Sequence, residues 1–351
     1  MKRFLDLDDL DSGRLEAVLR RARELEAHPY DTSLRGNTVG LVFMNPSLRT
    51  LASMEAGIAQ LGGLSFTVVP GQGSWTLETR DGAVMDGDAV EHVREAIPVL
   101  AQYASALGVR CFAGGKDLGE DLADGLIRLM ADLSPVPFIN LESAASHPCQ
   151  ALADWKTLED LDVQRNGGRF VLSWAYHPKP LPYAVPASVV TMAARRGMEV
   201  VVLRPEGYAL PESIMARARR VATRSGGSIE ETSDRRAAMD GAHVVYVKSW
   251  AAPEFYGRPA EEAPMRHAHR NWCVGESWFA PARPGAKLMH CLPVRRNVKV
   301  SDAVLDGPRS VVVRQAGNRL HAQKALLEEM LARPQRDLAI GASNAATGAG
   351  R

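Results

Sequence analysis

Three side chains near residue 50 are of types that bind phosphate. Ser47, Arg49 and Thr50 follow a short apolar run at 39–43 and precede a helix-like segment that extends to about residue 61. A strand feeding such a turn exposes backbone N–H groups and the positive end of a helix, and the guanidinium adds a charged donor. The pattern predicts a cradle for a phosphorylated ligand, although a lone Ser-x-Arg-Thr is also typical of a helix N-cap beside an exposed arginine.

Three more clusters fall where strands are predicted to end. They are His147-Pro148-Cys149-Gln150, the stretch 174–181 with His177, and the stretch 290–297 that begins His-Cys-Leu-Pro. A histidine beside a proline is, by itself, more typical of a capped helix start than of a catalyst. Loops beyond the carboxyl ends of strands are, however, where open α/β sheets bind ligands. Taken together with residues 47–50, the clusters indicate one site.

Strand-like and helix-like segments alternate along the chain, which predicts parallel sheets. Helices are predicted at 12–26, 47–61, 90–103, 118–133, 147–160, 184–196, 212–225 and 318–331. Strands are predicted at 38–43, 65–69, 106–112, 137–140, 169–174, 199–203, 244–247 and 310–313, with a buried segment at 287–291. The fold class that follows is α/β, with two doubly wound parallel-sheet domains and the active site in the crevice between them.

The expected domains are 1–145, completed by a C-terminal helix at 318–332, and 146–317. Residues 333–351 are rich in Gly, Ala, Ser and Arg and are expected to form a disordered tail.

Composition excludes several classes of partner. The 351 residues include 42 basic and 41 acidic side chains, so the net charge of +1 gives no overall field for nucleic acid or an anionic membrane. We find neither a signal peptide nor a membrane span and expect a cytoplasmic protein. The four cysteines show no CxxC or metal-ligand spacing, so neither a disulfide framework nor a structural metal is indicated.

The Ser-x-Arg-Thr, His-Pro-x-Gln and His-Cys-Leu-Pro motifs, in this order, resemble those of the carbamoyltransferase family, the aspartate and ornithine transcarbamylases, over residues 1–332. The resemblance implies that the first motif grips the phosphate of carbamoyl phosphate and the second its carbamoyl group. The third would face the amino-acid substrate. It also implies a homotrimer with active sites at subunit interfaces, small-molecule substrates and no cofactor.

Carbamoyl transfer explains why these residue types are needed. An amine attacks the carbamoyl carbon, a tetrahedral oxyanion forms and phosphate leaves, so the site must hold a dianion, polarise a carbonyl and align a neutral amine. Thr50, Arg110 and His147 are the expected catalytic donors to the carbonyl oxygen. The residues expected to bind carbamoyl phosphate are Ser47, Leu48, Arg49, Thr50, Trp75, Arg110, His147, Gln150, Leu292 and Arg319.

The acceptor amine is indicated by Lys248. Ornithine transcarbamylases carry a Ser-Met-Gly loop for the free α-amino and carboxylate groups, and the matching stretch 246–250 lacks it. Lys248 suits a carboxylate but repels an α-ammonium, so the α-nitrogen is expected to be acylated. The residues expected to bind the acylornithine are Val90, Glu142, His177, Lys248, Cys291, Leu292 and Arg295.

The acyl group depends on one position. Acetyl-using members of this branch carry a glutamate where this chain has Val90, and succinyl-using members a proline. Val90 removes a like charge that would face a succinyl carboxylate, which slightly favours N-succinyl- over N-acetyl-ornithine. Against this, Lys299 stands where acetyl-using members have a lysine that can be carboxylated. The tryptophan matching Trp75 reaches the neighbouring subunit's site in this branch.

Two rival functions stay open at this point. The chain could carbamoylate another amine, such as ornithine, putrescine or aspartate. It could also be a non-catalytic paralogue that binds carbamoyl phosphate, because Leu51 stands where most relatives have a further arginine. The other matching residues are all present, so we expect activity.

Overall fold

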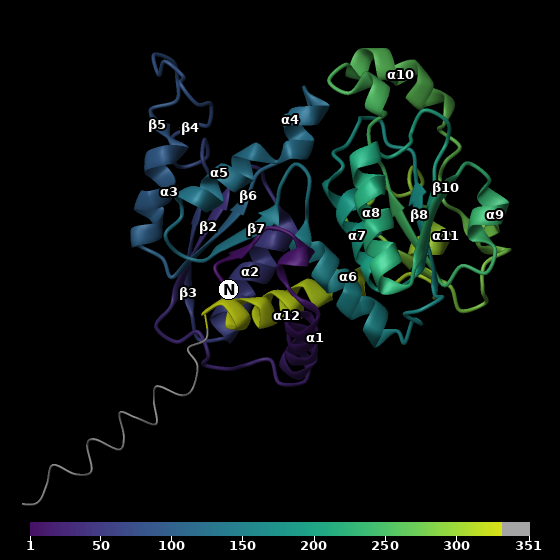
Figure 1. Ribbon diagram of the computed structural model, residues 1–351, viewed down its shortest axis with the longest axis horizontal. Helices are drawn as coiled ribbons and strands as arrows, with labels where there is room; N and C mark the ends of the chain where they lie inside the picture. Colours follow the sequence, from purple (N-terminus) through teal and green to yellow (C-terminus); the bar gives the residue numbers. More distant parts are fainter. Residues whose placement is uncertain (332–351) are drawn as a thin grey trace, which may run out of the picture.

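The computed structural model describes residues 1–331 and contains two five-stranded parallel sheets side by side (Figure 1). The first has the order β1-β7-β6-β2-β3, and the second has the order β10-β9-β8-β11-β12. Strands of the first sheet are β1 (Arg3–Phe4), β2 (Thr38–Phe43), β3 (Leu64–Val68), β6 (Ala106–Arg110) and β7 (Phe138–Glu142). Strands of the second are β8 (Arg169–Trp174), β9 (Glu199–Leu203), β10 (Ser228–Thr232), β11 (Val244–Lys248) and β12 (Lys287–Met289). The α/β class with parallel sheets is therefore confirmed.

We call the first sheet and its helices the first half, and the second sheet and its helices the second half. Helices of the first half are α1 (Ser12–Ala27), α2 (Leu48–Gln60), α3 (Val93–Gln102), α4 (Leu118–Ala123) and α5 (Gly125–Leu133). Helices of the second half are α7 (Ala184–Arg195), α8 (Glu212–Ser225), α9 (Arg235–Met239), α10 (Pro259–Ala268) and α11 (Asp302–Leu305). A small ribbon, β4 (Leu77–Glu78) with β5 (Glu91–His92), lies beside α3 (Figure 1).

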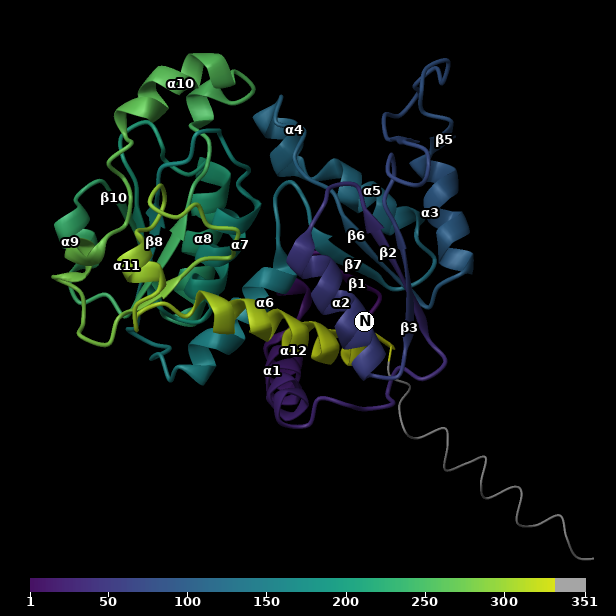
Figure 2. The same ribbon diagram turned by 180° about the vertical axis from the view of Figure 1, so that it is seen from behind.

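Helices α6 (Pro148–Asp160) and α12 (Val312–Leu331) join the halves. Helix α6 contacts β7 of the first half and α7 of the second, and α12 packs against α6, α1 and α2 (Figure 2). Leu326 and Leu327 of α12 are each 1% exposed, and burying such a side chain contributes roughly 1.5–3 kcal/mol. Helix α12 therefore belongs to the core that α1 and α2 share.

Two predicted elements differ in the structure. The prediction of a strand at 310–313 is wrong. Of these residues only Ser310 forms a β-bridge, to Leu288, and α12 already begins at Val312. The β-branched run Val311–Val313 suits a strand, but packing of α12 along α6 outweighs that preference. The helix predicted at 118–133 is interrupted at Asp124, whose φ of 56° is left-handed and whose carboxylate accepts hydrogen bonds from Ser143 Oγ and the Ala144 N–H.

The tail predicted at 333–351 lies outside the described residues. Within residues 1–331, no helix combines the length and apolar character that a membrane crossing requires.

Candidate active site

A cavity of about 430 Å³ lies between the two halves, at the carboxyl ends of their strands. Arg110 and Glu142 end β6 and β7, and Lys248 ends β11. The predicted residues that line it are Ser47, Arg49, Thr50, Arg110, Glu142, His147, His177, Lys248, Cys291, Leu292, Arg295, Lys299 and Arg319. A larger cavity of about 780 Å³ lies between α1 and helices α7 and α8, but it contains none of them. The chemistry therefore identifies the smaller cavity as the site.

The turn before α2 has the predicted form. Ser47 is the N-cap, and its Oγ accepts a 3.2 Å hydrogen bond from the Thr50 N–H. Asn45 Oδ1 accepts a 2.7 Å hydrogen bond from the Phe112 N–H, which ties this turn to the loop after β6. The N-terminal end of α2 therefore faces the cavity at a fixed place beside Arg110.

Three arginines surround this part of the cavity. Among the described residues, the buried Nε–H groups of Arg49, Arg110 and Arg319 have no hydrogen-bond partner. Arg319 also donates through Nη2 to Thr50 Oγ1 at 2.8 Å and through Nη1 to Gln150 Oε1 at 3.2 Å. Burial lowers the pKa of Arg49 and Arg319, yet a guanidinium remains protonated. Three cations with spare buried donors make a site for a multiply charged anion.

Glu142 provides a negative charge beside these cations. Its carboxylate pairs with Arg110 Nη1 and lies 3.3 Å from His147 Nε2. The sequence led us to place Glu142 around the acyl substituent of the substrate; the geometry adds the contact with Arg110 and His147. A contact between the ends of β6 and β7 follows from their pairing in the sheet, which the motifs alone do not reveal.

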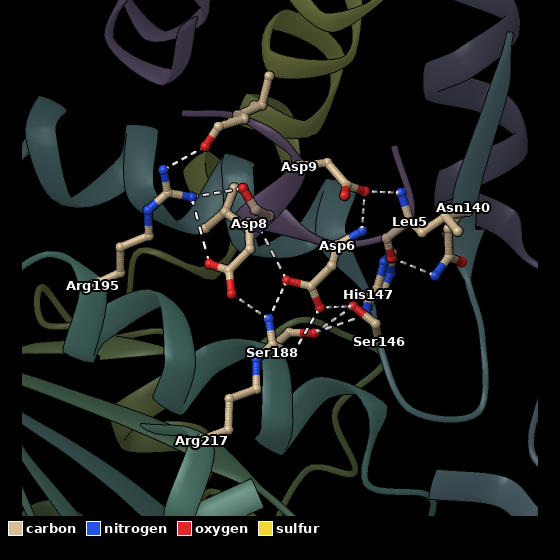
Figure 3. A network of polar contacts seen from close by, with 12 residues as sticks. Leu5, Asp6, Asp8, Asp9, Asn140, Ser146, His147, Ser188, Arg195 and Arg217 are labelled. Carbon is tan, nitrogen blue, oxygen red and sulfur yellow. Dashed lines mark hydrogen bonds and ion pairs between the residues drawn. The ribbon is translucent and has the colours of Figure 1, made fainter. Parts of the chain in front are cut away.

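His147 is a neutral imidazole. Burial, followed by the nearby Arg319 and Arg110, holds its pKa well below the ordinary value. Its backbone N–H donates to Ser188 Oγ of α7 at 2.8 Å, next to the network that includes Ser146 and Asp6 (Figure 3). A neutral ring held this way can donate one N–H to a carbonyl oxygen.

Basic side chains of the second half, among them Lys248, Lys299 and Arg295, line the part of the cavity that faces the first half. Lys248 Nζ lies 3.4 Å from Cys291 Sγ. Burial, followed by the charge of Lys248, lowers the pKa of Lys299 to about 7. Burial also lowers the pKa of His177 to about 4, and Arg295 Nε lies 3.1 Å from His177 Nε2. This part of the site is cationic and suits the carboxylates of an amino-acid substrate.

Four predicted residues do not line the cavity. Gln150 is 2% exposed, and its Oε1 accepts a hydrogen bond from Arg319, which does line the cavity. Leu48 is 80% exposed, so only its backbone can serve the turn. Trp75 and Val90 are 56% and 66% exposed and shortly precede β4 and β5 in the sequence. Figure 2 shows β5 beside α3, at the end of the first half that lies away from the second half.

Some lining residues were not predicted from the sequence. They are Phe112, Leu181, Pro182, Val185 and Pro293. The Arg110 guanidinium lies 4.3 Å from the ring centroid of Phe112, an arrangement that holds the arginine by a cation–π contact. The position of Phe112, two residues after the end of β6, was the available signal. Within residues 1–331, no three His, Cys, Asp or Glu side chains are grouped so as to hold a metal ion.

Two family models cover the chain. The carbamoyl-P binding domain of aspartate/ornithine carbamoyltransferases matches residues 2–160, and their Asp/Orn binding domain matches residues 184–330. Fold, cavity and these matches define a carbamoyltransferase. The chain belongs to the aspartate/ornithine carbamoyltransferase family, as the motifs predicted.

Several individual relatives and solved structures are similar to this chain over almost its whole length. The N-acetylornithine carbamoyltransferase of Xanthomonas campestris pv. campestris is 40% identical over 334 residues, which are 94% of this chain and 98% of that protein. The N-succinylornithine carbamoyltransferase of Bacteroides fragilis is 35% identical over 335 residues, covering 94% and 99%. A solved glutamate-to-valine variant of an N-acetyl-L-ornithine transcarbamylase, complexed with carbamyl phosphate and N-succinyl-L-norvaline, has a TM-score of 0.90 at 40% identity, covering 94% and 100%.

Proposed function

We propose that this enzyme transfers the carbamoyl group of carbamoyl phosphate to the δ-amine of an N-acyl-L-ornithine, giving N-acyl-L-citrulline and phosphate in arginine biosynthesis. The observation that carries the proposal is the set of three buried arginine Nε–H groups around one cavity, which suits the phosphate. Arg49, Arg110 and the N-terminal end of α2 hold the phosphate. These contacts strengthen as charge moves onto it while the C–O bond breaks.

The carbamoyl group is bound from both halves. Thr50, Arg110 and His147 donate to its carbonyl oxygen, where negative charge develops as the amine attacks. Gln150 and the Leu292 carbonyl accept from its NH2 group. The departing phosphate takes the proton that the amine loses.

The acylated acceptor follows from Lys248. Its ammonium suits the α-carboxylate, and a free α-ammonium would be repelled by Lys248 and by the neighbouring arginines. Glu142, His177, Cys291 and Arg295 complete this side. The names of the relatives from Xanthomonas and Bacteroides, both acylornithine carbamoyltransferases, support the assignment.

For the acyl group we propose succinyl, on the evidence of Val90. The solved glutamate-to-valine variant was crystallised with N-succinyl-L-norvaline, which supports a link between loss of a glutamate and acceptance of a succinyl group. The 40% identity to an N-acetylornithine enzyme favours acetyl instead. Val90→Glu should shift kcat/KM about tenfold from succinyl- toward acetyl-ornithine, because the new carboxylate repels a second carboxylate. A wild type that strongly prefers the acetyl compound would show that Val90 is not the selector.

Lys299 is a proposed site of carboxylation. With a pKa of about 7, part of its amine is neutral and can attack CO2, forming an N–C bond and releasing a proton to leave a carbamate. A carbamate signal in 13C NMR after addition of labelled bicarbonate, absent from Lys299→Met, tests this proposal.

The proposed assembly is a cytoplasmic homotrimer in which Trp75 and Val90 of one subunit reach the cavity of the next. Both side chains are exposed and neither lines the cavity of its own chain, which supports this arrangement. We propose residues 1–145 with the C-terminal helix as the carbamoyl phosphate domain and 146–317 as the acylornithine domain.

Turnover with a panel of amines tests the function. Purified enzyme and carbamoyl phosphate are incubated with N-succinyl-ornithine, N-acetyl-ornithine, ornithine, putrescine and aspartate, and the ureido product is measured by colour development. We expect product with the two acylornithines. If ornithine, putrescine or aspartate gives product and neither acylornithine does, the chain is a different carbamoyltransferase. Binding of carbamoyl phosphate without product from any amine would favour the non-catalytic alternative, in which Leu51 has weakened the site.

A further inference from the structure

Asp154 is a buried carboxylate on α6, one helical turn after Gln150, with no exposed surface. Its Oδ1 accepts a 2.8 Å hydrogen bond from Gln150 Nε2 and a 2.7 Å hydrogen bond from Gln315 Nε2. The two donors are side-chain amides on different helices, α6 and α12. Asp154 therefore joins the two helices that connect the halves.

Gln150 connects Asp154 to the phosphate side of the cavity through hydrogen bonds. Gln150 Oε1 accepts from Arg319 Nη1 at 3.2 Å, and Arg319 Nη2 donates to Thr50 Oγ1 at 2.8 Å. The orientation of the Gln150 amide thus sets which atom meets the arginine.

The second glutamine leads to the opposite wall. Gln315 Oε1 accepts from the backbone N–H of His290 at 2.9 Å, and His290 Nδ1 accepts from the Leu292 N–H at 2.8 Å. A continuous series of hydrogen bonds therefore runs from Thr50 through Asp154 to Leu292.

A carboxylate makes this series directional. An ionised carboxylate can only accept, whereas an amide has a donor end and an acceptor end of nearly equal shape. Burial raises the pKa of Asp154 to about 6, which leaves it ionised at neutral pH. Both amides must then turn their NH2 groups toward Asp154 and their oxygens away from it.

We propose that Asp154 is a positioning residue for carbamoyl transfer. It directs the Gln150 oxygen toward Arg319 and, through Gln315, fixes the backbone of residues 290–292 on the other wall. The inference rests on the proposed function, in which the Gln150 oxygen and the Leu292 carbonyl accept from the carbamoyl NH2. Asp154 itself does not line the cavity and touches no substrate.

Steady-state kinetics of Asp154→Ala and Asp154→Asn test the proposal. The alanine variant should raise KM for carbamoyl phosphate at least tenfold, because both amides can then rotate. The asparagine variant keeps the shape but carries a donor end, so it no longer dictates the direction of the two amides and should also raise this KM, by at least about threefold. Glu159→Ala removes another carboxylate from α6, one that pairs with Arg165 and Arg196, and should leave this KM unchanged. Equal KM values for Asp154→Ala and Glu159→Ala would overturn the proposal.

A double-mutant cycle shows whether Asp154 acts through Gln150. In a Gln150→Met background, Asp154→Ala should raise KM by no more than about threefold, because the Gln150 amide is gone and only the Gln315 amide is left to reorient. Additive effects in the cycle would contradict the proposal. If Asp154→Ala does not fold, Asp154→Asn decides, since an unchanged KM in that variant would overturn the proposal.

Calorimetry of carbamoyl phosphate binding, without an acceptor amine, tests this inference independently of the proposed function. If wild type binds carbamoyl phosphate but carbamoylates no acylornithine, the proposed function fails. A tenfold weaker affinity of Asp154→Ala would still support the positioning role, and an unchanged affinity would overturn it.

Discussion

The Asp6 carboxylate, in the segment after β1, accepts hydrogen bonds of 3.0 and 2.5 Å from the Arg217 guanidinium of α8 (Figure 3). This pair links the first half to the second. Arg195 of α7 donates to the carbonyl oxygens of Leu7 and Leu10 from the same side. Because Ser146 also donates to Asp6, the link lies one residue from His147. It holds the halves together next to the site.

Asp6→Asn should lower stability in a way that depends on pH. Burial raises the pKa of Asp6, but Arg217 outweighs it, so the folded-state pKa lies below the ordinary value. The unfolded chain therefore binds more protons near that pKa, and the stabilisation is present above about pH 4 and lost as the pH falls. Urea unfolding should show wild type about 1–2 kcal/mol more stable at pH 7, with the gap closing below about pH 4.

The exposed pair Arg3–Asp132 lies within one half and supplies the control. Asp132→Asn should change stability by less than about 0.5 kcal/mol. A gap between wild type and Asp6→Asn that stays constant with pH would contradict the role of the Asp6 charge.

Arg49→Ala should remove most activity from a folded protein. Arg49 has no hydrogen bond to any of residues 1–331 that would be lost, so the change removes a charge directed at phosphate. We expect kcat/KM for carbamoyl phosphate to fall at least about 100-fold, or roughly 2.7 kcal/mol of transition-state stabilisation. Arg314→Ala, on the exposed face of α12, serves as the charge-matched control. A wild-type kcat/KM in Arg49→Ala would refute the phosphate assignment.

Trp75→Ala should impair the site of the neighbouring subunit, while the cavity residues of the subunit that carries the substitution stay intact. Mixing inactive Trp75→Ala subunits with inactive Arg49→Ala subunits should restore activity, because some sites then receive Trp75 from one subunit and Arg49 from another. For random trimers we expect recovery on the order of one site in four. Activity no higher than that of the parent variants would place Trp75 within its own chain.

Lys299→Met should stabilise the protein at neutral pH. The lowered folded-state pKa means that the unfolded chain binds more protons between about pH 7 and 10. Wild type therefore gains stability relative to the variant as the pH rises. The advantage of Lys299→Met should shrink by about 2 kcal/mol between pH 7 and 9 in urea unfolding. An advantage that grows over this range would contradict the burial of a charged amine.

The sequence was sufficient for most elements that carry the site. Strand β2, the N-cap Ser47 and the strands that end at Trp174 and Leu203 follow from apolar runs and cap chemistry. Edge strands were harder, because their composition is weak: β1 has only two residues, and β10 reads Ser-Ile-Glu-Glu-Thr. Register, bridges and pairing partners depend on the tertiary fold.

The residues of the site also fall into two groups: those that the sequence identifies and those whose roles depend on the tertiary fold. Motifs identified Arg49, His147 and Lys248, because each follows a recognisable strand end. They did not identify the pairing of Glu142 with Arg110 or the role of Asp154, since these depend on which strands and helices are neighbours in space. Local patterns identify residue types, and packing decides their partners.

Helix α12 has a consequence for how the protein is made. It packs on α1 and α2, and it brings Arg319 to the cavity formed largely by residues translated much earlier. The first half therefore cannot reach its final packing during synthesis, because its last helix is still on the ribosome while the whole second half emerges. We expect a nascent chain stopped before residue 312 to expose the apolar surfaces of α1 and α2, and the longer chain to complete its anion site only after α12 has left the ribosome.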